Sequence, residues 1–216
     1  VGYVPQLSAE GLLSLKPDAV IGTSDAGPPV VIEQIRQAGV RVALIAAKHN
    51  WAEVQEKVKV VGRETGRVAD ADKLLAQLDA QWSAVQAQVA KAARKPRVLF
   101  VMSHAGSPQV SGKGTAANAL IQYAGCVNAI DQFDGYKPLT AEALASAAPE
   151  VIINTTQGIE ALGGEAAFWK RPELALTPAF AKKALVTLEA SHLLGFGPRL
   201  PSAVQALHMR ALQWVA

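Results

Sequence analysis

Two glutamates stand at matching places in two similar stretches of this sequence. The first stretch spans residues 2–18 and contains Glu10, and the second spans residues 135–150 and contains Glu142. From Leu7 onward the two stretches align without a gap. A repeat at this distance is too long for a solenoid unit and indicates two similar lobes. Each lobe would then offer the same glutamate.

The residue types in these stretches permit two kinds of chemistry. A glutamate in the first turn of a helix stabilises the helix dipole by about 0.3–1 kcal/mol. That effect explains one glutamate, whereas one carboxylate in each lobe could also bind arginines of a symmetric dimeric partner. Tyr3 and Tyr136 precede the two predicted helices. A loop tyrosine is usually a packing residue, but bound ferric iron would stabilise its phenolate as a ligand.

Signals for an enzyme are weak. The run at residues 112–115, Gly-Lys-Gly-Thr, lacks the spacing of a phosphate-binding loop. No G-x-S-x-G motif occurs, and the four histidines have no metal-ligand spacing among themselves. A single cysteine, Cys126, excludes an internal disulfide and is best interpreted as a small buried hydrophobe. We therefore expect a binding protein, not an enzyme.

The elements that position these residues follow an α/β pattern. Leucines at helical spacing predict a short helix over residues 10–15, with Ser8 as its N-cap and Pro17 ending it. The all-apolar run at residues 19–21 is typical of a parallel strand covered on both faces, and further strands are predicted at residues 40–45, 97–102, 151–153 and 184–188. Further helices are predicted over residues 30–39, 51–62, 115–124, 165–171 and 202–215.

The longest helical signal runs from about Ala69 to Arg94, with apolar residues on one stripe. At about 1.5 Å per residue this helix would be close to 40 Å long. We predict an α/β fold of two Rossmann-like lobes with mainly parallel sheets, joined by this spine helix. The predicted parts are an N-terminal lobe over residues 1–66, the spine over 67–95 and a C-terminal lobe over 96–216. Because the chain enters directly on a Gly-Tyr loop, we expect the N-terminal lobe to be incomplete.

Composition excludes several classes of function. The net charge is +3 and the isoelectric point is about 9.0, with Lys and Arg scattered along the chain, so we expect no nucleic-acid partner. No apolar run reaches the roughly 18 residues that a membrane span requires. We therefore expect no direct membrane insertion.

Several runs together resemble a known family. Residues 2–18, followed by Gly27-Pro28-Pro29, are similar to the periplasmic haem-binding proteins of bacterial ABC haem importers. Residues 135–138 and 195–201 fit the same family, and the resemblance covers essentially the whole chain. It implies a monomeric protein of the periplasm that carries haem to the permease dimer of an inner-membrane ABC transporter. The broader class has two α/β lobes bridged by one long helix.

The resemblance also implies roles for individual residues. Tyr3 matches the tyrosine that ligates ferric haem in the cleft between lobes, and Glu10 and Glu142 match the glutamates that engage permease arginines. Relatives often have an arginine two residues after the tyrosine, where this chain has Pro5, which offers no donor. Lys137 is then the candidate to support the phenolate or to bind a haem propionate.

Other positions leave alternatives open. Thr155 and Thr156 occupy the strand-end loop where some relatives place an arginine facing the haem. His104 could be a hydrogen-bonded loop histidine, a second iron ligand opposite Tyr3, or the ligand of a second haem. The cargo could also be cobalamin or a ferric siderophore. An α/β enzyme with a nucleotide at the strand ends is the most distant alternative.

Overall fold

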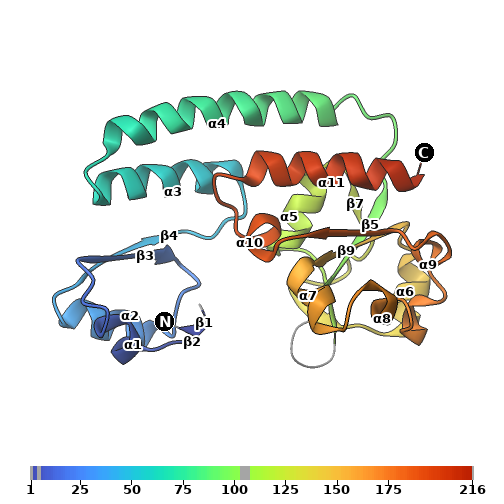
Figure 1. Ribbon diagram of the computed structural model, residues 1–216, viewed down its shortest axis with the longest axis horizontal. Helices are drawn as coiled ribbons and strands as arrows, with labels where there is room; N and C mark the ends of the chain where they lie inside the picture. The colour runs from blue at the N-terminus through green and yellow to red at the C-terminus, as the bar shows by residue number, and fades with distance from the viewer. Residues whose placement is uncertain (1, 4–5, 103–107, 216) are drawn as a thin grey trace. The chain divides into compact units, whose positions relative to one another are not determined.

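A computed structural model describes residues 2–3, 6–102 and 108–215 (Figure 1). The chain divides into two compact units, residues 1–77 and 78–216. The division falls inside one helix, α4 (Val68–Val89), which runs from the first unit into the second. The predicted three-part division at residues 66 and 95 stays a prediction.

The first unit alternates short strands and helices. It contains β1 (Gly2–Tyr3), β2 (Gln6–Leu7), α1 (Ala9–Leu13), β3 (Ala19–Thr23), α2 (Pro29–Gln37), β4 (Arg41–Ile45) and α3 (Trp51–Glu64). β3 and β4 pair in parallel, as their apolar runs predict. Leu12, Val31 and Ile35 form a small buried core between the helices. The predicted loop around Tyr3 is wrong in part, because β1 pairs with β2 in antiparallel orientation, with Tyr3 opposite Gln6.

The second unit holds the larger sheet. Its elements are β5 (Arg97–Met102), β6 (Gln109–Ser111), α5 (Ala116–Tyr123), β7 (Val127–Asn128), β8 (Tyr136–Pro138), α6 (Ala141–Ala147), β9 (Val151–Thr155), α7 (Thr156–Ala161), α8 (Glu165–Phe168), a 3-10 turn (Pro172–Leu174), α9 (Pro178–Lys182), β10 (Leu185–Leu188), α10 (Ala190–Leu194) and α11 (Leu200–Val215). β10, β9, β5 and β7 lie in that order as parallel neighbours. β6 and β8 add an antiparallel extension beside β5.

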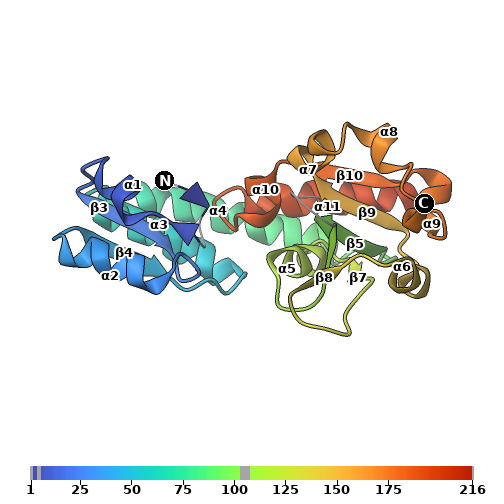
Figure 2. The same ribbon diagram turned by 90° about the horizontal axis from the view of Figure 1, so that it is seen from below.

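Helices cover both faces of this sheet. α5 and α11 lie on one face, and α7 and α8 lie on the other (Figure 1; Figure 2 shows the same elements from below). The middle of β5, residues 98–101, is fully buried, as is the start of β9, residues 151–153. Strands that are apolar at every position fold this way because both of their faces can be buried against helices. The predicted α/β class with mainly parallel strands is confirmed.

Some predicted boundaries are wrong. α4 ends at Val89, short of Arg94, because the apolar stripe stops there and Ala92 N closes the last turn by donating to Val89 O at 3.1 Å. The predicted helix over residues 165–171 is shorter than expected, because α8 ends at Phe168 and a separate 3-10 turn follows only at Pro172–Leu174. Ser202 does not cap α11, which begins two residues earlier. β6, β7, β8, α9 and α10 were not predicted, because elements this short show no clear hydrophobic period.

The repeat seen in the sequence is also present in the backbone. Lys16 and Ala148 occupy aligned positions, and both are left-handed, with φ of 48° and 43°. Each stands directly before a proline, Pro17 or Pro149. Left-handed residues other than glycine are uncommon, so their recurrence at aligned positions indicates that the repeat extends to the backbone conformation there.

The single cysteine and the apolar character of the helices complete the description of the fold. Cys126 is only 6% exposed, and burial raises the pKa of its thiol to about 12, so it behaves as a small buried hydrophobe. Among the helices that the structure describes, none combines the length and the apolar character needed to cross a lipid bilayer.

Close packing between α3 and α4 gives a test of the fold. A methyl group added at Gly62 would lie 2.5 Å from the Cβ of Ala71. Although alanine is favoured over glycine in a helix by about 1 kcal/mol, we expect Gly62→Ala to lower the free energy of unfolding by about 1–3 kcal/mol through overpacking. Urea denaturation followed by circular dichroism measures this. Adding Ala71→Gly should restore part of the loss, and a more stable Gly62→Ala protein would contradict the packing.

Candidate functional site at the carboxyl ends of the sheet

The sheet of the second unit has a topological switch point between β5 and β9. The chain runs from β5 to β7 through α5 on one face, and from β9 to β10 through α7 and α8 on the opposite face (Figure 1). In open α/β sheets, ligands bind in the crevice beyond the carboxyl ends of the strands at such a point. The topology therefore selects the ends of β5 and β9 as the candidate site of this unit.

Two of the predicted residues lie at this edge. Phe100 pairs with Ile153, so Thr155 lies level with Met102 at the end of the neighbouring strand. Thr156 begins α7 directly after it. The predicted loop after β9 is wrong, because Thr155 caps α7: its Oγ1 accepts a hydrogen bond from Gly158 N at 2.9 Å. The Thr155 hydroxyl keeps its O–H as a donor for a ligand.

His104 follows Met102 by two residues in the sequence but lies outside the described residues. The same holds for Pro5 and for the side chain of Tyr3, whose backbone belongs to β1 in the first unit. Iron ligation by Tyr3 and the part played by His104 stay predictions. Across the described residues there is no group of three or more His, Cys, Asp or Glu side chains that could hold a metal ion.

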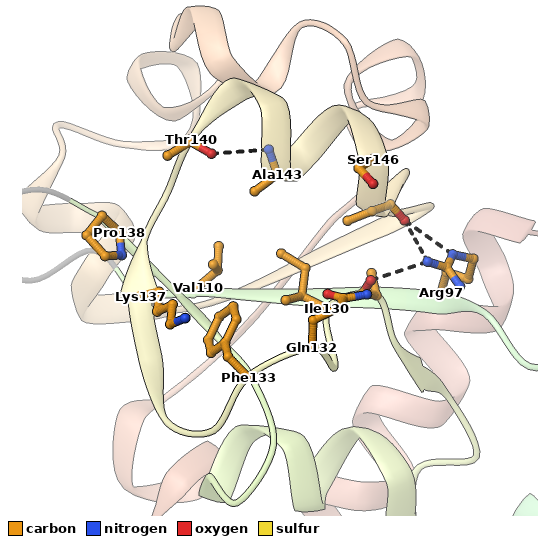
Figure 3. Close-up of a pocket in the computed structure, with 12 residues that line it drawn as sticks. Arg97, Val110, Ile130, Gln132, Phe133, Lys137, Pro138, Thr140, Ala143 and Ser146 are labelled. Carbon is orange, nitrogen blue, oxygen red and sulfur yellow. Dashed lines mark hydrogen bonds between the residues drawn. The ribbon is translucent and has the colours of Figure 1, made fainter.

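Lys137 lies on the same sheet as the threonines but points away from the strand ends. Lys137 belongs to β8 and pairs with Val110 on β6. Its strand, β8, lies three strand spacings from β9, or about 14 Å across the sheet. Its Nζ lies 4.7 Å from the centre of the Phe133 ring. Lys137 and Phe133 line a cavity of about 480 Å³ beneath α6 (Figure 3). To meet a ligand at the strand ends, the lysine side chain would have to swing out of this cavity.

The two predicted docking glutamates have matching local structure. Glu10 lies in the first turn of α1, where Ser8 Oγ accepts a hydrogen bond from the backbone N–H of Gly11 at 3.1 Å. Glu142 lies in the first turn of α6, where Thr140 Oγ1 accepts the equivalent bond at 3.1 Å. Both glutamates are exposed. Neither carboxylate forms an ion pair with another described residue, so both are available to an external cation.

A polar network beyond β10 was missed by the sequence reasoning. Arg199 Nη2 donates to Glu189 Oε2 at 3.1 Å and to Ser191 Oγ at 2.7 Å. Gln157, on α7, accepts a hydrogen bond from Ala190 N at 3.0 Å and so ties the end of β9 to the end of β10. The available signals were the position of Glu189 directly after a strand and the place of Arg199 in the run at residues 195–201.

This network has a defined charge state near neutral pH. Hydrogen bonds from Ser191, its hydroxyl first and then its N–H, lower the pKa of Glu189 to about 2, and Arg199 adds to the effect. Burial, and then the positive charge of Arg199, lower the pKa of His192. The edge therefore carries a carboxylate and a guanidinium, beside an imidazole whose protonated form is disfavoured.

The repeated capped helix, the parallel strands and the switch-point edge together define the class of protein. The chain belongs to the periplasmic binding protein family, whose sequence model matches residues 1–191. Among solved structures, it is similar to the periplasmic haem-binding protein BhuT in complex with two haems, with 45% identity and a TM-score of 0.93 over the whole of this chain and 82% of BhuT. It is also similar to RhuT, a periplasmic haem-binding protein from Roseiflexus sp. RS-1, with 35% identity and a TM-score of 0.93 over the whole of this chain and 83% of RhuT.

Curated relatives widen the range of ligands. A cobalamin-binding protein of Halobacterium salinarum is 26% identical over 205 residues, which cover 92% of this chain and 54% of that protein. The chain spans between 54% and 64% of the lengths of the curated relatives that it matches. The predicted family and fold class are thus confirmed.

The charge state of the network is open to a direct test. We expect the Glu189 carboxyl to titrate near pH 2, because Ser191 and Arg199 stabilise its charged form. In Ser191→Ala the largest cause is removed, so the pKa should rise toward the ordinary value of about 4.3. Carbon-detected NMR titration of the glutamate carboxyl resonances measures both values. A Glu189 pKa near 4 in the unaltered protein would refute the network.

Proposed function

We propose that this chain is a haem-binding protein of the periplasm that delivers haem to an inner-membrane ABC importer. The observation that supports this most is its likeness to BhuT, at 45% identity and a TM-score of 0.93, because that structure holds two haems. RhuT, also described as a haem-binding protein, supports the same proposal at 35% identity. Haem is cargo in this proposal, and the chain performs no catalysis.

Ferric haem is held by Tyr3 through its phenolate. A free phenol has a pKa near 10, so about one molecule in a thousand is ionised at neutral pH. Coordination to Fe³⁺ stabilises the anion, and a nearby cation helps further. Pro5 offers no donor, which leaves this support to a group elsewhere. His104, two residues beyond β5, is the candidate for a second axial position or a second haem.

Lys137, Thr155 and Thr156 are the proposed contacts to the haem edge. Lys137 leaves the Phe133 ring, a cation–π contact worth about 0.5–1 kcal/mol at an exposed site, and gains a charge-assisted bond to a propionate, which is stronger. Its flexible four-carbon stem permits this movement. Thr155 and Thr156 contact a propionate or a second ligand at the strand ends, and Thr155 can donate its O–H in this contact.

Docking uses the two exposed glutamates. Glu10 and Glu142 each bind an arginine of one permease subunit, which suits a partner with two-fold symmetry. Their carboxylates lack ion pairs with described residues, so no internal bond has to break first. Haem is released when the permease, holding both glutamates, draws the two lobes slightly apart.

Cobalamin is the second candidate cargo, and the cobalamin-binding relative from Halobacterium salinarum favours it. The two ligands make different demands, because a cobalamin carrier needs no tyrosinate on the metal. Titrating the protein with hemin and, separately, with cyanocobalamin decides between them. Saturable binding of cyanocobalamin with no hemin binding would replace the first proposal with the second.

The ligand assignment predicts the effect of Tyr3→Phe. Adding hemin to the unaltered protein should give a shifted Soret band and a high-spin ferric spectrum of the tyrosinate type. Both should be lost in Tyr3→Phe, because phenylalanine has no oxygen for iron. Tyr136→Phe is the matched control, since Tyr136 is the tyrosine of the other copy of the repeat. An unchanged spectrum in Tyr3→Phe would show that another residue ligates the iron.

The docking assignment predicts a separate effect. Glu10→Ala combined with Glu142→Ala should leave hemin binding intact and reduce haem transport into proteoliposomes that contain the importer at least tenfold, because both anchoring carboxylates are lost. Glu33→Ala with Glu160→Ala removes one exposed glutamate from each unit elsewhere and serves as the control. Normal transport by the Glu10 and Glu142 double variant would exclude docking through these residues.

A further inference from the structure

A small hollow lies beyond β10, beside the network of Glu189, Ser191 and Arg199. Its volume is about 220 Å³, and its lining includes Ser191, His192, Gly197 and Arg199. Sites that hold a whole small molecule usually range from roughly 300 to 1,000 Å³. The hollow is therefore of a size to receive one substituent of a larger ligand.

The hollow belongs to the same sheet edge as the candidate site. Leu188, the last residue of β10, pairs with Thr155 at the end of β9, and Glu189 follows directly. Gln157, in the first turn of α7, donates from its Nε2 to Glu189 Oε1 at 3.4 Å. Arg199 is one hydrogen bond further, on Glu189 Oε2. A ligand at the strand ends can therefore place a substituent beside Arg199.

Arg199 is held at both its backbone and its side chain. Ser202 Oγ donates to Arg199 O at 2.8 Å, and His192 Nε2 lies 2.8 Å from the same hydroxyl. Nη2 is held by Glu189 and Ser191. The side chain is nevertheless 61% exposed, and no described residue accepts a hydrogen bond from its Nε or Nη1. A fixed guanidinium with spare N–H groups offers directed donors to a carboxylate.

Positive charge exceeds negative charge around the hollow. Burial first lowers the pKa of His192; the charges of Arg199 and Arg210 lower it further, and only the charge of Glu189 opposes them. Arg210 donates to a neutral acceptor, Thr187 O, at 2.9 Å, and no described carboxylate pairs with it. Two guanidinium groups thus stand against one carboxylate. This balance favours an anion as the occupant of the hollow.

We propose that the hollow binds a carboxylate of the ligand and that Arg199 is the residue that selects it. Haem carries two propionate carboxylates, whereas the side chains around the corrin ring of cobalamin end mainly in uncharged amides. Arg199 therefore favours haem over cobalamin by charge. This inference rests on the proposed function and adds a specificity-determining residue to it. The second propionate remains available to Lys137.

Comparing hemin with hemin dimethyl ester isolates the contribution of the carboxylates. The ester keeps the ring and the iron but lacks both negative charges. Arg199→Gln removes the guanidinium charge, and Arg199→Lys keeps a charge without the fixed fork. Arg36→Gln is the control, because Arg36 is a surface arginine of the first unit whose guanidinium lies 3.9 Å from Glu33. Soret titration gives the dissociation constant of each ligand for each protein.

We expect the unaltered protein to bind hemin at least tenfold more tightly than the ester. Arg199→Gln should weaken hemin binding at least tenfold and change ester binding less than twofold. Arg199→Lys should keep part of the preference for hemin, and Arg36→Gln should keep all of it. A purely structural role of Arg199 would instead weaken the binding of both ligands equally.

A second variant leaves the network intact and tests the hollow itself. Gly197 lines the hollow, and a Cβ added there meets no atom within 4 Å. A side chain at this position therefore enters open space. We expect Gly197→Leu to weaken hemin binding at least fivefold, because it takes up room that the propionate needs. This variant also decides the matter if Arg199→Gln does not fold.

Three outcomes would overturn the proposal. The unaltered protein could bind hemin and its ester equally, Arg199→Gln could weaken both ligands alike, or hemin binding could be unchanged in both Arg199→Gln and Gly197→Leu. In each case hemin still binds, so the proposed function survives. Binding of cyanocobalamin without binding of hemin would refute the proposed function itself, and so distinguishes the two failures.

Discussion

The parallel pairing of β5 with β9 is the constraint on which the second unit depends. Residues 98–101 and 151–153 are apolar at every position and fully buried, so both faces of these strands must be covered by helices. The connection that follows β5 crosses one face of the sheet, and the connection that follows β9 crosses the opposite face. This reversal creates the switch point between the carboxyl ends of the two strands. The site is a consequence of this burial, and Thr155 reaches it only because Ile153 pairs with Phe100.

Sequence patterns predicted this framework well because burial on both faces leaves a clear signature. The longer buried strands, most of the longer helices and the repeat were visible in residue types and spacing. The N-cap at Ser8 was predicted correctly, because a hydroxyl before an apolar run has one evident use. The end of α4 was placed too late, since Lys91 and Arg94 suit a helix end whether or not the helix reaches them.

The site was less predictable, because its geometry depends on pairings between distant residues. Lys137 was expected to face the ligand, but its strand pairing turns it toward Phe133 under α6. Thr155 was expected in a loop, yet its hydroxyl caps α7. The network of Glu189, Ser191 and Arg199 forms only when residues ten positions apart meet beyond β10. No periodicity in the sequence reports such contacts.

The left-handed residues Lys16 and Ala148 have a consequence for how such a protein can diversify. Each stretch enters its helix at a hydroxyl cap and leaves it through a left-handed residue and a proline. The two stretches therefore share their entry cap and their left-handed exit, although α1 ends at Leu13 and α6 extends to Ala147. Recognition can then evolve separately on each stretch, by substitutions such as leucine against alanine at positions 15 and 147, while the scaffold stays the same.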